Sequence, residues 1–153
     1  LGTVLMENRN GLAVDVRLTE ANGTAEREAA LEMLSEQAGN KRISVGADKA
    51  YDHAAFVDGC RELNVVPHLA QNTSGRKSRI ESRSTRHPGY SISQIIRKRI
   101  ETLFGDSKQH GTLRQVTVRG LERVESVCLL NITTANLRRM ARLIQWPAAP
   151  ATG

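Results

Sequence analysis

The chain has 153 residues, of which 39% are hydrophobic and 25% are charged, and this composition is typical of one globular domain rather than of a disordered or fibrous chain. Lys and Arg outnumber Asp and Glu by 22 to 16, which favours a polyanionic partner. No apolar stretch approaches the roughly 20 residues of a membrane span, so we expect no membrane partner.

The first part of the chain predicts a β-hairpin. Apolar runs at residues 3–7 and 12–18 flank the segment Asn8-Arg9-Asn10-Gly11. An Asn-Gly pair after a strand is a strong hairpin signal, because both residues tolerate positive φ. The second run alternates, and the apolar residues expected on its one side are Val14, Val16 and Leu18.

Helices and strands alternate after the hairpin. The expected elements are a helix between Asn22 and Gly39, a strand at 42–48, a helix that Asp52 caps, and a strand at 65–69. Pro67 places the last of these at a sheet edge or a strand end. The order β-β-α-β-α-β therefore predicts an α/β fold.

Residues 71–92 are expected to form a mobile basic loop. Its cations lie among Ser, Thr, Gly and Asn residues, and they are Arg76, Lys77, Arg79, Arg83 and Arg86. A solvated surface run and an anion-binding loop explain this pattern about equally well. We expect a helix from about 93 to 108, a long final helix from Leu121 and a disordered tail at 146–153, which leaves residues 1–145 as one domain.

Asp48 is the first candidate for a catalytic or metal-binding residue. It ends a buried strand, and ligands usually bind where the strands of an α/β sheet end. The small residues Gly46 and Ala47 before it would let another backbone or a metal ion approach closely. An acid after a strand is more often a turn residue or a helix N-cap, so both interpretations stay open.

A second pattern lies on the helix predicted at 93–108. Gln94, Arg97, Glu101 and Lys108 fall within a sector of roughly 60° on one helix face. Glu101 should lie at the border of the core, where a carboxylate needs a partner or a metal. An amphipathic helix with an Arg97–Glu101 ion pair would give the same spacing.

Three segments of the chain together resemble bacterial insertion-sequence transposases of the DDE type, namely residues 46–52, 66–72 and 97–108. The third acidic motif of that family reads Tyr-x-x-Arg-x-x-x-Glu-x-x-x-x-x-x-Lys. Arg97, Glu101 and Lys108 match it in register, whereas Gln94 replaces the Tyr. The resemblance implies a ribonuclease H-like fold, in which helices flank a mixed sheet.

The resemblance also implies roles for single residues. Asp48 and Glu101 resemble the second and third catalytic acids, which would bind Mg²⁺ or Mn²⁺. Such enzymes cleave phosphodiester bonds at the element ends and then join the freed 3′-hydroxyl to target DNA. Arg97 and Lys108 would hold phosphates near the metal ions. Further candidates for contacts with double-stranded DNA are Lys49, Arg76, Lys77, Arg79, Arg83 and Arg86.

The family's first acid should lie on a strand before the hairpin, between it and the 43–48 strand in the sheet. The chain opens at Leu1 inside a strand pattern, so we expect a fragment without that strand, marginally folded and inactive alone. The full-length protein would be cytoplasmic, nucleoid-associated and a homodimer. One alternative is a non-catalytic remnant that binds DNA or a partner. Another is an unrelated nucleic-acid-binding module, against which the 3% of aromatic residues argues.

Overall fold

The computed structural model describes residues 1–72, 74, 77–109 and 117–144, without the side chains of residues 106–109. Its elements are β1 (Gly2–Met6), β2 (Ala13–Leu18), α1 (Ala25–Gln37), β3 (Ile43–Ala47), the short 3₁₀ helix η1 (Lys49–Tyr51), α2 (Ala54–Glu62), β4 (Val65–Leu69), α3 (Ser82–Arg86), α4 (Pro88–Ile96), α5 (Arg99–Gln109) and α6 (Leu121–Leu143). The α/β class is confirmed. Within these ranges no helix has the length and apolarity to cross a membrane, and the tail predicted at 146–153 lies outside them.

β1 and β2 form the predicted antiparallel hairpin, in which Val4 pairs with Val16. The register shifts between Leu5 and Met6, and such an irregularity interrupts the alternation of side chains. Val14 falls at this point and is 45% exposed. The prediction that Val14 lies on one side of the strand with Val16 and Leu18 is therefore wrong.

A side chain closes the hairpin turn. The Glu7 carboxylate accepts hydrogen bonds from the backbone N–H groups of Arg9 at 2.7 Å, Asn10 at 2.7 Å and Leu12 at 3.2 Å. Gly11 has a φ of +70°, whereas Asn10 does not adopt positive φ. Burial raises the pKa of Glu7, but the backbone hydrogen bonds outweigh it and leave the pKa below its usual range.

β3 and β4 pair in parallel, and the described strands form two separate two-stranded sheets. The single mixed sheet is therefore not confirmed. A cavity of about 530 Å³ lies between β1 and β3, and residues of α1, α4 and α5 complete its lining. Consecutive residues of both strands line this cavity, as expected of strands that turn an open edge toward it.

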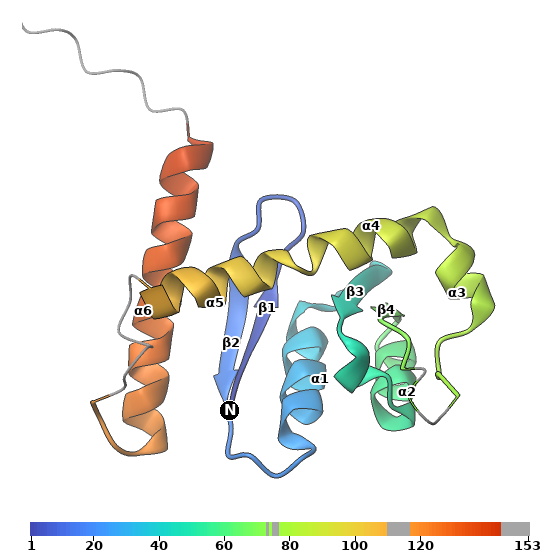
Figure 1. Ribbon diagram of the computed structural model, residues 1–153, viewed down its shortest axis with the longest axis horizontal. Coiled ribbons are helices and arrows are strands. Elements are labelled where there is room, and N and C mark those ends of the chain that lie inside the picture. The colour runs from blue at the N-terminus through green and yellow to red at the C-terminus, as the bar shows by residue number, and fades with distance from the viewer. Residues whose placement is uncertain (73, 75–76, 110–116, 145–153) are drawn as a thin grey trace, which may run out of the picture.

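The apolar core is divided between the two sheets. One cluster packs β3 and β4 against α1 and α2, and its buried residues are Leu34, Phe56, Val57, Cys60, Val65, Leu69 and Ile80. The other packs the hairpin against α5 and α6, and its buried residues are Val4, Leu103, Cys128 and Ile132. Both cysteines are free and buried. Figure 1 shows α4 and α5 running across both halves.

The helix predicted at 93–108 is two helices. α4 begins at Pro88, earlier than predicted, and ends at Ile96. Between the helices, Ile100 N–H bonds to the Arg97 carbonyl and Glu101 N–H bonds to the Lys98 carbonyl. These bonds span three residues instead of four, so the chain is wound more tightly at the junction.

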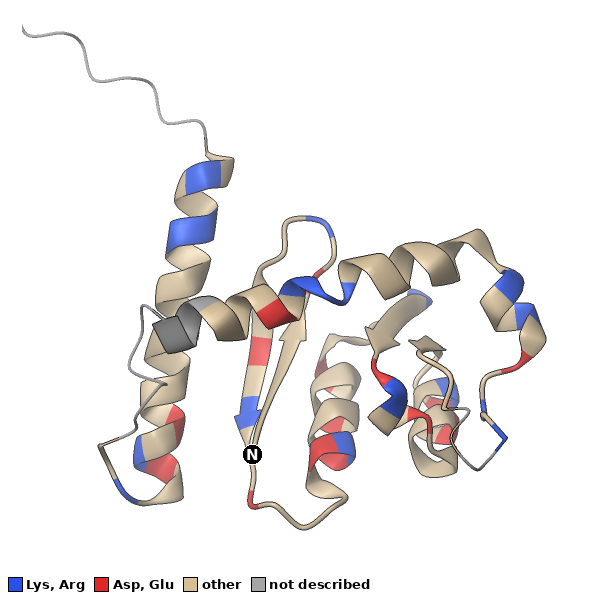
Figure 2. Cartoon of the chain, viewed as in Figure 1, with Lys and Arg blue, Asp and Glu red and all other residues tan. Residues whose placement is uncertain are grey.

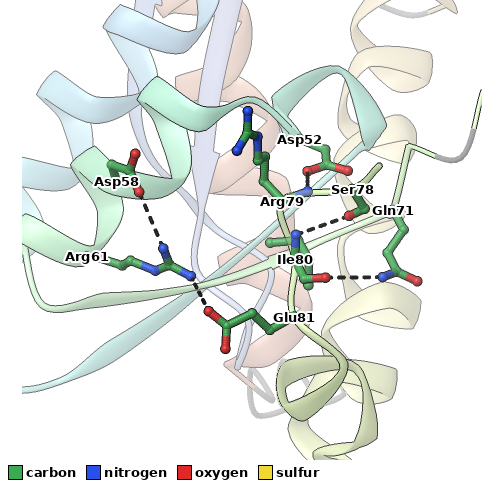
Figure 3. Close-up of polar contacts among 8 residues, drawn as sticks. All are labelled: Asp52, Asp58, Arg61, Gln71, Ser78, Arg79, Ile80 and Glu81. Atoms are coloured by element: carbon green, nitrogen blue, oxygen red, sulfur yellow. Dashed lines mark hydrogen bonds and ion pairs between the residues drawn. The ribbon is translucent and has the colours of Figure 1, made fainter. Parts of the chain in front are cut away.

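The prediction of a loop over residues 71–92 is wrong in its second half, which contains α3 and the start of α4. Buried Asp52 anchors the first half. Its carboxylate accepts the backbone N–H of Asn72 at 2.8 Å. It also accepts the backbone N–H of Arg79 at 2.8 Å, as Figure 3 shows. Asp52 is therefore not the predicted cap of α2, whose N-cap residue is His53.

Candidate active site

Asp48 and Glu101 line the same cavity between the two sheets. Asp48 follows β3, and Glu101 lies in the first turn of α5. Both residues are exposed, so a ligand in the cavity can reach both carboxylates. Arg97, which joins α4 to α5, lines the cavity as well.

Asp48 also has the common structural role of a strand-end acid. Its Oδ1 atom accepts the backbone N–H of Ala50 at 2.8 Å, which makes Asp48 the N-cap of η1. This bond uses one carboxylate oxygen and fixes the orientation of the side chain. The capping role and the place in the cavity are compatible.

Gly46 lets α4 approach β3 closely. A Cβ atom at Gly46 would lie 3.2 Å from the Ser93 carbonyl oxygen and 3.5 Å from the Arg97 Cβ atom. A side chain here would push α4 and Arg97 away from β3. The small residue before Asp48 therefore has the expected effect, with a helix as the approaching backbone.

Gln94, which stands at the Tyr position of the motif, joins β4 to Arg97. Its Nε2 group donates to the His68 carbonyl at 2.7 Å, and its Oε1 atom accepts from Arg97 Nε at 2.9 Å. The buried ring of His68 is itself fixed, because its Nδ1 atom lies 2.7 Å from Ser93 Oγ. Sequence reasoning missed this connection, and its only signal was the spacing of three residues between Gln94 and Arg97.

Two other acids line the cavity, but both already have hydrogen-bond partners. Glu7 closes the hairpin turn, as described above. Glu26 accepts the Tyr51 hydroxyl at 2.8 Å, and burial together with this bond raises the pKa of Tyr51. Of the four acids, Asp48 and Glu101 are the two that are exposed, so a ligand can reach them most easily.

The other cations named from the sequence lie elsewhere or are not described. Lys77 and Arg79 line a cavity of about 630 Å³ beside α2, where Arg61 bridges Asp58 and Glu81 (Figure 3). Lys49, Arg83 and Arg86 are exposed on η1 and α3. Arg76 and the side chain of Lys108 lie outside the described part of the chain.

The donor set fits a hard divalent cation in kind. Asp48 and Glu101 offer carboxylate oxygens, the ligands that Mg²⁺ prefers in proteins. Within the described ranges, no three His, Cys, Asp or Glu side chains are grouped so as to hold a metal ion. Two carboxylates hold such an ion more weakly than the three that the resemblance implies for the family.

The fold and this cavity define an α/β domain that presents two carboxylates and an arginine to one space. The family model for transposase DDE domains matches residues 3–137, which is most of the chain. The chain therefore belongs to the transposase DDE domain family, and the resemblance inferred from its motifs is confirmed. No curated protein and no solved structure matches the chain significantly.

Proposed function

We propose that this chain is part of a transposase that cleaves phosphodiester bonds at insertion-sequence ends and transfers the freed 3′-hydroxyl to target DNA. One observation carries the proposal: Asp48 and Glu101 line one cavity beside Arg97 in a chain of this family. Double-stranded DNA is the substrate, and the full-length protein would be cytoplasmic and associated with the nucleoid.

Asp48 and Glu101 would hold a divalent cation, either Mg²⁺ or Mn²⁺. A cation bound there supplies the Lewis acid for displacement at phosphorus. Arg97 would hold a backbone phosphate, since Gln94 occupies its Nε group and leaves the terminal nitrogens as donors. Further phosphate contacts are proposed for Lys108, Lys49, Arg76, Lys77, Arg79, Arg83 and Arg86.

We also propose that the site lacks its third carboxylate and that the chain alone is inactive. Neither β1 nor β3 has a second strand partner among the described residues, and the cavity lies between them. The hydroxyl of Thr3, buried on β1, has no hydrogen-bond partner in the described part. An extended segment that carries the first Asp would fill this space and pair with both strands.

A titration with Mn²⁺, followed by electron paramagnetic resonance, tests the metal site. We expect weak binding by the wild-type chain and at least a tenfold loss in Asp48→Asn and in Glu101→Gln. The double variant should bind more weakly than either single one, with losses that do not simply add, because both residues would ligate the same ion. The matched controls Asp58→Asn and Glu125→Gln should bind like wild type. An unchanged affinity in either site variant would overturn the assignment.

Nicking of supercoiled plasmid in Mg²⁺ tests the catalytic state of the chain. We expect no nicking, because a two-carboxylate site holds the metal weakly. Metal-dependent nicking that Asp48→Asn abolishes would refute the proposal that the site is incomplete. It would leave the assignment of Asp48 as a metal ligand intact. DNA binding without any effect of metal would favour the second candidate, a non-catalytic remnant.

A homodimer remains a proposal for the full-length protein. α6 exposes Leu130, Leu137 and the capping Ile144, which are 68%, 60% and 54% exposed. Their spacing of seven residues is typical of helices that pack against each other lengthwise.

A further inference from the structure

A second cavity, of about 160 Å³, lies where the hairpin turn meets α5 and α6. Four arginines line it, namely Arg99, Arg138, Arg139 and Arg142, and no Asp or Glu does. Leu103 and Ala135 contribute apolar surface. Four like charges around one small space repel one another unless an anion lies between them.

Two of these arginines are held in place by neutral groups of the hairpin turn. Arg99 Nη1 donates to the Asn8 carbonyl at 2.9 Å, and Arg139 Nε donates to the Asn10 carbonyl at 2.8 Å. Arg139 also lies against Gly11, where a Cβ atom would be 3.6 Å from its Nη2 atom. These bonds orient the guanidinium groups without neutralising them, so less side-chain entropy is lost when an anion binds.

The other two arginines are free to reach a ligand. Arg138 and Arg142 are four residues apart on α6 and therefore share one face of the helix. Neither side chain forms a hydrogen bond or an ion pair with another described residue. The ion pairs found in the described ranges all involve Arg17 or Arg61.

The acidic residues of α6 are confined to its start. Glu122 and Glu125 lie near its start, and the cavity arginines begin 13 residues later, at a rise of about 20 Å along the axis. Figure 2 shows basic segments in the C-terminal half of α6, at the hairpin tip and at the junction of α4 with α5. The helix dipole accounts for Arg142 in the last turn of α6, but it disfavours Arg99, the first residue of α5.

We propose that this cavity binds a backbone phosphate of DNA, at a site distinct from the Asp48 and Glu101 carboxylates. Arginine pairs with phosphate through two parallel hydrogen bonds. Met6 lines both cavities. At the junction of α4 with α5, Arg97 lines the first cavity and Arg99 lines the second. A duplex held at the first cavity therefore continues past the hairpin turn onto α6. The inference takes its DNA partner from the proposed function but not its metal chemistry.

Fluorescence anisotropy with a labelled 20-base-pair duplex, in buffer without divalent metal, tests the site. Arg138→Ala combined with Arg142→Ala removes two charges and no hydrogen bond within the described part. The matched control combines Arg119→Ala with Arg123→Ala, which removes the same net charge near the start of α6. We expect a Kd about tenfold or more higher for the first pair and a salt slope smaller by about 1.8, since each lost phosphate contact lowers the slope by about 0.9. The control should stay within about twofold of wild type.

The remaining outcomes are decisive as well. The pair Arg138→Lys and Arg142→Lys keeps the charge and should restore part of the affinity, and equal melting temperatures show that the variants fold. Equal losses in the two alanine pairs, or no DNA binding by the wild-type chain, would overturn the proposal. Competition by polyglutamate but not by a second duplex would assign the site to an acidic protein instead. The assay contains no divalent metal, so a failure of the catalytic proposal is seen separately, in the Mn²⁺ titration.

Discussion

Glu7 shows how a single side chain fixes a turn near the candidate site. Its carboxylate accepts three backbone N–H groups of the hairpin turn, and the turn carbonyls of Asn8 and Asn10 in turn hold Arg99 and Arg139. One acid therefore orders the peptide groups that position two arginines.

Glu7→Gln should lower the free energy of unfolding by about 1–2 kcal/mol at pH 7, because the neutral amide is a weaker acceptor for several N–H groups. Urea unfolding measures this loss, with the exposed Glu20→Gln as the control. The folded-state pKa of Glu7 lies below its unfolded value, so its contribution is present above the ordinary carboxyl range and is lost as pH falls through the folded pKa. The difference between wild type and Glu7→Gln should therefore shrink in acid, and a constant difference down to pH 3 would contradict this account.

At the residue scale, the sequence predicted those site residues that a motif with fixed spacing identifies. Arg97 and Glu101 were found from spacing along one segment, and both line the cavity with Asp48. The roles of Asp52 and Gln94 were missed, because their partners are distant in sequence and are backbone atoms. The arginines at 138, 139 and 142 are close together in the sequence, but nothing in the sequence placed Arg99 beside them.

At the scale of elements, the packing of β3 against α4 depends on Gly46. Gly46→Val should lower the free energy of unfolding by about 1–3 kcal/mol, since a side chain meets the Ser93 carbonyl and the Arg97 Cβ atom. It should also weaken Mn²⁺ binding, because a shift of α4 moves α5 and its Glu101, which follow directly in the chain. Gly39→Ala, where a Cβ atom meets nothing within 4 Å, serves as the control. Wild-type stability and metal affinity in Gly46→Val would refute this packing.

The segment after β4 depends on Asp52 in a similar way. Asp52→Ala leaves the N–H groups of Asn72 and Arg79 without their acceptor, so trypsin should cleave after Lys77 or Arg79 several-fold faster. Asp58→Ala, on the exposed side of α2, should change the rate little, because a surface ion pair contributes under about 1 kcal/mol. Equal cleavage rates in wild type and Asp52→Ala would rule out the anchor.

Element types were easier to predict than element limits. The hairpin, the strands β3 and β4 and the long α6 follow from local patterns and are confirmed. The helix at 93–108 was predicted as one because its apolar period continues through Arg97, whereas the backbone tightens at that point. Residues 82–86 appeared to be loop because they have no apolar stripe, yet they form α3.

At the scale of the whole molecule, two apolar clusters and two small sheets flank the cavity between β1 and β3. A Val- and Ile-rich peptide of about six residues that ends in Asp should enter it and protect β1 and β3 amides from hydrogen exchange. The same peptide should strengthen Mn²⁺ binding at least tenfold, and its Asn-ended version should protect without that gain. A control peptide with a central Pro lacks one backbone N–H group needed for pairing with a neighbouring strand. Equal protection by this control would show that the peptide does not pair as a strand.

The central claim is that Asp48 and Glu101 bind one divalent cation. The most direct measurement is the crystal structure of the chain soaked in Mn²⁺, with anomalous diffraction to locate the ion. The account predicts an anomalous peak in the cavity between β1 and β3, with carboxylate oxygens of both residues coordinating it. No peak there, or two carboxyl groups with protein packed between them, would contradict the account.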